Sequence, residues 1–224
     1  MTTGLARGMT NVDRLVQELA TKVLEAMRDG VYSLVEGSRA QAREVIRKDE
    51  EINLLTDRLT EQCVIVISLY QPNIDDAREL SALQRVAGDL ERIGDYAKGA
   101  ARFAQKLHHP IKMKIRRKLK DVFLEMQERT SEMVALAVSA FLDRNVKKAE
   151  QIFEMDKAVN ELEKKARDIF TNENFPIQEK LMIDHITHNL ERMGDRAKNI
   201  ARQAMYVKEG HYRHHTDEES ELVV

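Results

Sequence analysis

The 224-residue chain has few of the residues that favour turns, β-strands or disulfides. It contains three prolines, nine glycines, one cysteine and no tryptophan, and aromatic residues make up 5% of it. A β-sandwich needs frequent turns and strands rich in β-branched or aromatic residues, so this composition disfavours that fold. The single cysteine, Cys63, has no partner for an intramolecular disulfide, and we therefore expect a reducing, cytoplasmic location.

Long apolar segments and an excess of one charge are also missing. The longest apolar stretch, from Cys63 to Tyr70, is too short to span a bilayer. The first ten residues lack the apolar core of a signal peptide. With 36 basic and 38 acidic residues the net charge is -2, so we expect no nucleic-acid partner. The content of 33% charged and 42% hydrophobic residues is typical of long amphipathic helices.

No motif of a common enzyme class is present. The chain has no G-x-S-x-G nucleophile turn, no Walker A loop, no G-x-G-x-x-G fingerprint and no H-E-x-x-H zinc motif. No glutamate is followed three residues later by histidine, although di-iron helical bundles use that motif. We therefore predict that the protein is not an enzyme.

Apolar residues near the start of the chain recur at alternating intervals of four and three: Val12, Val16, Leu19, Val23 and Ala26. This spacing places them on one face of a helix in a bundle. Gly37 and the three prolines mark breaks, because the residue before a proline avoids the helical region. Asn73 is a suitable N-cap for the helix that follows Pro72.

The same reasoning predicts six helices in two sets of three. They cover about residues 11–36, 40–70, 73–107, a stretch from the Pro110 break to 143, 145–172 and 176–209. The predicted fold is all-α, with two tandem, sequence-duplicated three-helix bundles. The first bundle comprises residues 1–109 and the second 110–210, followed by a flexible C-terminal tail, 211–224.

A sequence repeat supports this division. Residues 90–102, LERIGDYAKGAAR, match residues 190–202, LERMGDRAKNIAR, at nine of 13 positions. A weaker pair, 47–53 and 154–160, shares an aspartate and an asparagine four residues later. The two pairs are offset by 100 and 107 residues, which requires only loops of different length. The chain is thus interpreted as a duplicated three-helix unit.

Carboxylates recur at helical spacing within these repeats. Glu91 and Asp95 lie four residues apart, which places them on one helix face. If the second helix of each half packs against the third, four oxygen-bearing side chains converge there. Close carboxylates repel unless a proton or a cation compensates, and hard or borderline cations prefer oxygen ligands. We predict one metal site per half. The candidate ligands are Asp49, Asn53, Glu91 and Asp95 in the first half, and Asp156, Asn160, Glu191 and Asp195 in the second.

Two simpler interpretations stay open. Acidic pairs at this spacing often belong to a solvated helix face, and Glu91 can pair with Arg92, with Lys98 or with another helix. Gly94 and Gly194 occupy matching positions, although a glycine inside a helix costs about 1 kcal/mol relative to alanine. Each glycine indicates either close helix packing or contact with a ligand.

Basic residues cluster between the two halves. Seven lysines and arginines and no acidic residue lie from Lys106 to Lys120. Such a run suits an acidic partner or an anionic membrane surface, or it is only a solvated helix start. Together with arginines of the repeat, it supplies the candidate partner-binding residues, which are Arg92, Arg192, Lys112, Lys114, Arg116 and Arg117.

The paired L-E-R-x-G-D segments at 90–95 and 190–195, each in the third helix of its half, resemble the PhoU family. The Asp-x-x-x-Asn segments in the middle helices extend the resemblance, which covers about residues 10–210. It implies two tandem three-helix bundles in a cytoplasmic accessory protein of the phosphate-specific ABC transporter. It further implies a negative regulator of the phosphate-starvation response that modulates phosphate uptake.

The partners implied by the resemblance are the transporter's ATPase subunit and a sensor histidine kinase, with membrane association only through these partners. A homodimer is also implied. Several family members carry multinuclear metal clusters, so the resemblance implies divalent or trivalent metal (Fe, Mn, Mg or Zn) that is not present in every purified member. It assigns the ligand role to Asp49, Glu91, Asp95, Asp156, Glu191 and Asp195, with Asn53 and Asn160 as helpers.

The two halves depart from each other at positions near these residues. Asp89 in the first half corresponds to Asn189 in the second, and Glu163 in the second corresponds to Thr56 in the first. We therefore expect two chemically unequal sites. Besides a regulatory adaptor, the residues leave two alternatives, a metal-binding or metal-storage bundle without a signalling role and a metallohydrolase. The second needs an open coordination position and a substrate pocket, neither of which the sequence indicates.

Overall fold

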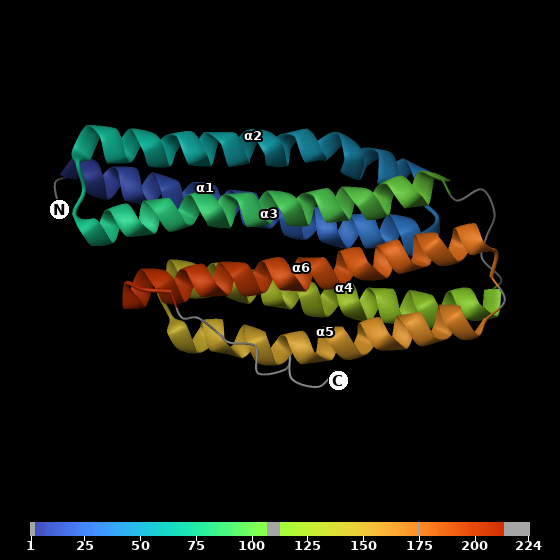
Figure 1. The fold of residues 1–224 in the computed structure, drawn as a ribbon. Helices are drawn as coiled ribbons and strands as arrows, with labels where there is room; N and C mark the ends of the chain where they lie inside the picture. The colour runs from blue at the N-terminus through green and yellow to red at the C-terminus, as the bar shows by residue number, and fades with distance from the viewer. Residues whose placement is uncertain (1–2, 107–112, 174, 213–224) are drawn as a thin grey trace.

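A computed structural model describes residues 3–106, 113–173 and 175–212 of the chain, with only the backbone described for 113–116. These residues form six α-helices and no strand (Figure 1). The helices are α1 (Thr3–Glu36), α2 (Arg39–Tyr70), α3 (Ile74–Lys106), α4 (Met113–Leu142), α5 (Val146–Asn172) and α6 (Ile177–Glu209). The all-α prediction is confirmed. The bounds of α2, α3, α5 and α6 agree with the predicted ones to within one residue.

The predicted start of the first helix, near residue 11, is wrong, because α1 begins at Thr3. Leu5 and Met9 continue the apolar seam and are buried. Gly4 and Gly8 interrupt the apolar pattern, which hides this first part of the helix from a periodicity argument. A Cβ at Gly4 would lie 2.7 Å from the Tyr70 ring, so the glycine lets the end of α2 approach α1 closely.

Local capping explains where the other helices begin. The Ser38 hydroxyl accepts a hydrogen bond from the Gln41 N–H at the start of α2, and the Asn145 side chain accepts one from the Lys148 N–H at the start of α5. Asn73, the predicted cap of α3, accepts from backbone N–H groups of the first turn. These side chains satisfy N–H groups that have no partner inside the helix.

The helices form two bundles, α1–α3 and α4–α6, which lie side by side in Figure 1. The bundles meet where α3 packs on α6 and α1 packs on α4, so that α2 and α5 lie at opposite outer edges. Residues 91–100 and 191–200 have the same pattern of buried and exposed positions, residue by residue. The predicted tandem arrangement is therefore confirmed by packing as well as by sequence.

The contact between the bundles includes Asp89, a position at which the two halves differ in sequence. Arg196 on α6 donates to Asp89 on α3 at 3.2 Å. Burial raises the pKa of Asp89, and the hydrogen bond from Arg196 opposes this effect. Asn189, the counterpart of Asp89, lies against Gly99, where an added Cβ would be 3.1 Å from the asparagine Nδ2. We call the surroundings of Asp89 the first corner of this interface and those of Asn189 the second corner. The first corner contains an ion pair and the second an uncharged contact.

A second link joins the turn before α5 to the first bundle. Arg144 has a positive φ of 51°, and its guanidinium pairs with the buried carboxylate of Glu79 on α3. The corresponding position in the first half is Gly37, which also has a positive φ of 69°. Left-handed backbone favours glycine, so at Arg144 the ion pair with Glu79 helps to hold a conformation that the residue type disfavours.

Cys63 is buried, and burial raises the pKa of its thiol to about 12. A thiol of this kind is a poor nucleophile at neutral pH. Within the described parts of the chain, no helix combines the length and hydrophobicity needed to cross a bilayer.

Candidate functional site

The predicted ligands lie along two related helix–helix contacts, one between α2 and α3 and the other between α5 and α6. We call the side chains of these two contacts the first and the second groove. In the first groove, α2 supplies Asp49 while α3 supplies Glu91 and Asp95. The α3 residues share a face because they are one helical turn apart. The expected packing of the second helix against the third therefore occurs in both halves.

A lysine is the central cation of the first groove. Lys98 Nζ donates to Asp49 Oδ2 across the groove and lies 3.6 Å from Asp95 Oδ1 on its own helix. The side chain of Asp49 is 6% exposed and that of Lys98 is 18% exposed. Arg92, at the rim, lies 3.5 Å from Asp95 Oδ2 and 3.7 Å from Glu91 Oε2. The carboxylates therefore have positive partners within the chain.

The second groove repeats this arrangement. Lys198 Nζ donates to Asp156 Oδ2 at 2.7 Å and lies 2.9 Å from Asp195 Oδ1. Asn160 Nδ2 also donates to Asp156 Oδ2, at 3.3 Å. Burial alone would lower the pKa of Lys198, but its hydrogen bonds to Asp156 and Asp195 outweigh burial and raise that pKa. The ammonium thus stays charged at neutral pH.

The surroundings of the second groove carry additional titratable groups. His188 Nδ1 lies 3.7 Å from Glu191 Oε2, and Arg192 Nε is 3.2 Å from His188 Nε2. Glu163 on α5 pairs with Arg167 at 2.9 Å. The residue that corresponds to His188 in the first half is Gly88, beside which an added Cβ would meet only open space.

The pKa of the repeat glutamate is raised in both halves, chiefly by burial. Burial, followed by repulsion from Asp195 and then from Glu163, raises the pKa of Glu191 to about 7. Burial and then repulsion from Asp95 also raise the pKa of Glu91. Thr56 stands in the first groove at the position of Glu163, and its buried hydroxyl has no hydrogen-bond partner among the described residues. The expectation of unequal sites agrees with these environments.

Asn53, the fourth candidate of the first half, is half-buried. Within the described residues, no hydrogen bond joins it to Asp49, whereas Asn160 does bind Asp156. Asn53 is therefore less closely associated with its aspartate than Asn160 is.

The two matching glycines face different neighbours. A Cβ at Gly94 would lie 3.1 Å from Ile52 Cδ1, which indicates close helix packing. A Cβ at Gly194 would lie 3.5 Å from Asp156 Oδ1 and 3.6 Å from Met133 Cε, both ordinary contacts. Of the two interpretations in the sequence analysis, packing accounts for Gly94, and Gly194 lies beside a buried carboxylate.

The donor atoms alone suit a hard cation, since they are carboxylate and amide oxygens. Their arrangement does not. Among the described residues, no group of three or more His, Cys, Asp or Glu side chains is placed to hold a metal ion. Asp49 and Asp156 each bind a lysine ammonium instead. The residues as arranged do not fit a metal, and the presence of one stays a prediction.

The predicted partner-binding residues are only partly described. Arg92 and Arg192 are exposed beside the two grooves, with side chains 60% and 45% exposed. Arg117 is exposed on the first turns of α4. Lys112 lies outside the described residues, as do the side chains of Lys114 and Arg116 and the tail residues 213–224.

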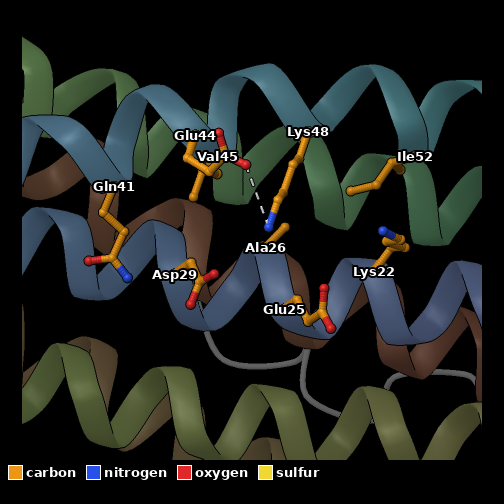
Figure 2. A pocket seen from close by; sticks show the side chains of 9 residues that line it. All are labelled: Lys22, Glu25, Ala26, Asp29, Gln41, Glu44, Val45, Lys48 and Ile52. Atoms are coloured by element: carbon orange, nitrogen blue, oxygen red, sulfur yellow. Dashed lines mark ion pairs between the residues drawn. The ribbon is translucent and has the colours of Figure 1, made fainter.

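Two concave regions lie elsewhere in the described structure. A cavity between α1 and α2 has room for about 30 Å³, close to the volume of one water molecule. Figure 2 shows the charged side chains around it, including Glu25, Asp29 and the Glu44–Lys48 pair, whose charged atoms are 3.7 Å apart. A larger, open groove of about 570 Å³ lies between α4 and α5, and charges of both signs, such as Lys118 and Asp168, line it. Neither contains a predicted ligand.

Sequence reasoning missed the role of Lys98 and Lys198. Both were visible, since lysine stands at the same place in each repeat. The sequence offers Lys98 only as a partner of Glu91. The identity of its actual partner, Asp49, depends on which helix faces which.

Comparisons with known proteins agree with the repeat. A family model described as "PhoU domain" matches residues 16–104 and 123–204, one match in each bundle. A protein of Thermotoga maritima described as "Phosphate-specific transport system accessory protein PhoU homolog 1" is 29% identical and aligns with 91% of this chain and 88% of its own. An Aquifex aeolicus "Phosphate-specific transport system accessory protein PhoU homolog" is 30% identical over 88% of this chain and 86% of its own.

Solved structures show the same fold. The crystal structure of PhoU from Pseudomonas aeruginosa superposes with a TM-score of 0.81 at 25% identity, covering 92% of this chain and 99% of that one. A Streptococcus pneumoniae structure, described as the phosphate transport system regulatory protein PhoU, gives 0.80 at 21% identity, covering 93% and 99%. The second comparison supports the fold alone.

Proposed function

This chain belongs to the PhoU family, and we propose from that premise that it is a cytoplasmic accessory protein of a phosphate-specific transport system. One observation carries the proposal: each bundle separately matches the PhoU domain, over residues 16–104 and 123–204. Relatives that align with most of the chain are named as accessory proteins of phosphate-specific transport. The chain therefore has both units of the family and not a single grafted one.

The proposed mechanism is contact, not catalysis. The protein binds the transporter's ATPase subunit and a sensor histidine kinase, and it represses the phosphate-starvation response while phosphate is plentiful. An adaptor passes on the state of the transporter only if it binds the states of its partner with different affinity. It needs exposed contact residues for this purpose, and Arg92, Arg192 and Arg117 are available on the surface.

The described chemistry agrees better with an adaptor than with an enzyme. The one thiol is buried with a high pKa. The buried aspartates of the two repeats, Asp49 and Asp156, are each paired with a lysine, as structural carboxylates often are. The metal-storage alternative needs both lysines to move away from the aspartates, and no observation favours it over the adaptor.

A genetic experiment tests the proposal. Alkaline phosphatase activity is measured in phosphate-replete cells that lack this gene and are complemented with the wild type or with R92E/R192E. We expect high activity without the gene, low activity with the wild type, and partial loss of repression with the double variant. R14E changes an arginine that is 57% exposed on α1 and serves as the matched control. Low activity in the deletion strain would contradict the proposed repression.

We also propose that the protein is a homodimer. Light scattering on the purified chain at several concentrations tests this separately. A mass of twice 25.8 kDa supports it. A constant monomer mass would remove the dimer from the proposal and leave the adaptor role intact.

A further inference from the structure

Lys98 and Lys198 occupy the same position in the two repeats, and each joins two helices of its bundle. Lys98 links α3 to Asp49 on α2, and Lys198 links α6 to Asp156 on α5. Both lysine side chains are 18% exposed. Lysine is normally a surface residue with a mobile ammonium group. Two lysines held in this way, at matching positions, indicate that the lysine is a structural component of each groove.

We propose that Lys98 and Lys198 are the resident cations of the two grooves and that they exclude divalent metal from these carboxylates. Each ammonium lies within 4 Å of two aspartates, one on its own helix and one on the neighbouring helix. A cation at that place offsets the repulsion between the aspartates. The lysine also joins the second and third helices of its bundle, as a metal ion bound between the same carboxylates would.

A metal ion that entered either groove would meet this ammonium first. Two like charges a few ångströms apart repel strongly where water is scarce. The metal would have to displace the lysine from an aspartate that is 5% exposed in the first groove and 7% exposed in the second. It would also need further ligands, and the nearest carboxylates, Glu91 and Glu191, each have an arginine 3.7 to 4.0 Å away at the rim. The oxygen atoms suit a metal, but their cationic neighbours oppose one.

This inference rests on the ion pairs and not on the proposed adaptor function. Contact with a transporter or kinase can occur with either kind of cation in the grooves. The experiment that follows uses the purified full chain and no reporter, so its failure and a failure of the adaptor proposal are distinguishable.

The test compares Mn²⁺ binding by the wild type and by the double variant K98M/K198M. Methionine keeps an unbranched side chain of similar length and removes the charge. We expect weak, non-stoichiometric binding to the wild type by titration calorimetry. In K98M/K198M we expect affinity to rise about tenfold or more, the scale on which neighbouring groups tune metal sites. Mn²⁺ should then raise the melting temperature of the variant and not that of the wild type, because a ligand stabilises the fold that binds it.

K147M is the matched control, because Lys147 is exposed on the first turn of α5 and lies away from the grooves. It should bind Mn²⁺ as the wild type does. Stoichiometric binding by the wild type that is lost in D49N/D156N would overturn the proposal, and this arm is decisive even if K98M/K198M does not fold. An unchanged affinity in a folded K98M/K198M would overturn it as well.

Discussion

The two halves of the molecule share a lysine–aspartate pair and differ at a few of the positions around it. The shared part is Lys98 with Asp49 and Lys198 with Asp156. Around the second pair lie Glu163 and His188, where the first half has Thr56 and Gly88. The pair joins helices and so serves the fold of each bundle. The surrounding charges are not needed for that purpose, which leaves them free to give each groove its own electrostatics.

A second difference lies on the outermost helices. α2 exposes large apolar side chains, including Leu54, Val64 and Leu69, which are 59%, 51% and 68% exposed. Among the described residues, α5 exposes no large hydrophobic side chain. The two bundles therefore present different surfaces although their cores are built alike. Duplication has preserved the helix packing while the outer faces have become distinct.

The largest expected effect tests the shared pair. K98M leaves the buried Asp49 carboxylate without its cation, and breaking a buried ion pair in this way costs about 3–5 kcal/mol. K198M should cost less, because Asp156 keeps the hydrogen bond from Asn160. Urea unfolding of each single variant measures the difference. Equal losses would show that Asn160 does not compensate, and K147M should change stability by less than about 0.5 kcal/mol.

The next effect concerns pH. Because the folded-state pKa of Glu191 is raised from 4.5 to about 7, the folded protein holds a proton that the unfolded chain releases between those values. The free energy of unfolding should therefore fall as pH rises from about 4.5 to 7, by an amount on the order of 3 kcal/mol, since each unit of pKa difference corresponds to about 1.4 kcal/mol.

E191Q should remove most of this pH dependence. E91Q should remove less, because Glu91 is less buried than Glu191 and also has no counterpart of Glu163 beside it. Unfolding at several pH values, together with carbon-13 NMR titration of the carboxyl groups, checks both statements. A titration midpoint for Glu191 at or below that for Glu91 would contradict the assigned environments.

A smaller change in stability is expected from differences in helix packing between the two bundles. A Cβ at Gly30 on α1 would lie 2.6 Å from the backbone oxygen of Ala97, so α1 and α3 approach too closely for a side chain. G30A should cost about 1–2 kcal/mol, because overpacking against backbone outweighs the helix preference for alanine. The corresponding residue of α4, offset by 107, is Ala137, where A137G should cost about 1 kcal/mol for the opposite reason. A stabilised G30A in thermal unfolding would refute the close approach.

The smallest effect tests the interface between the bundles. D89N makes the first corner resemble the second and weakens the contact with Arg196, at a cost of about 1 kcal/mol. N189D, the reverse exchange, should also destabilise, because it places a carboxylate beside Gly99 instead of beside an arginine. Thermal unfolding compares the two variants with the wild type. A stabilising N189D would mean that the corners are interchangeable.

Much of the fold could be predicted because residues next to each helix end determine where most of the helices begin and end. Ser38, Asn73 and Asn145 cap helices through their own side chains, and prolines precede α3 and α6. The start of α1 was missed because the reason for Gly4 and Gly8 lies in α2, far along the chain. The spacing of apolar residues within one helix carries no information about contacts with another helix.

The candidate site shows the same division. The repeat identified the acidic residues and the helix faces on which they lie. It did not identify the partner of Asp49, because an ion pair between α2 and α3 depends on how far one helix is rotated and shifted against the other. Lys98 and Lys198 were therefore present in the pattern, but their roles became visible only with the packed bundles.

The most direct test of the resident lysines is an anomalous difference map from crystals of the wild-type chain grown with Mn²⁺. The account predicts lysine Nζ beside Asp49 and Asp156, with no anomalous peak within bonding distance of either carboxylate. A strong peak ligated by Asp49 and Asp95, or by Asp156 and Asp195, with the lysine turned away, would contradict it.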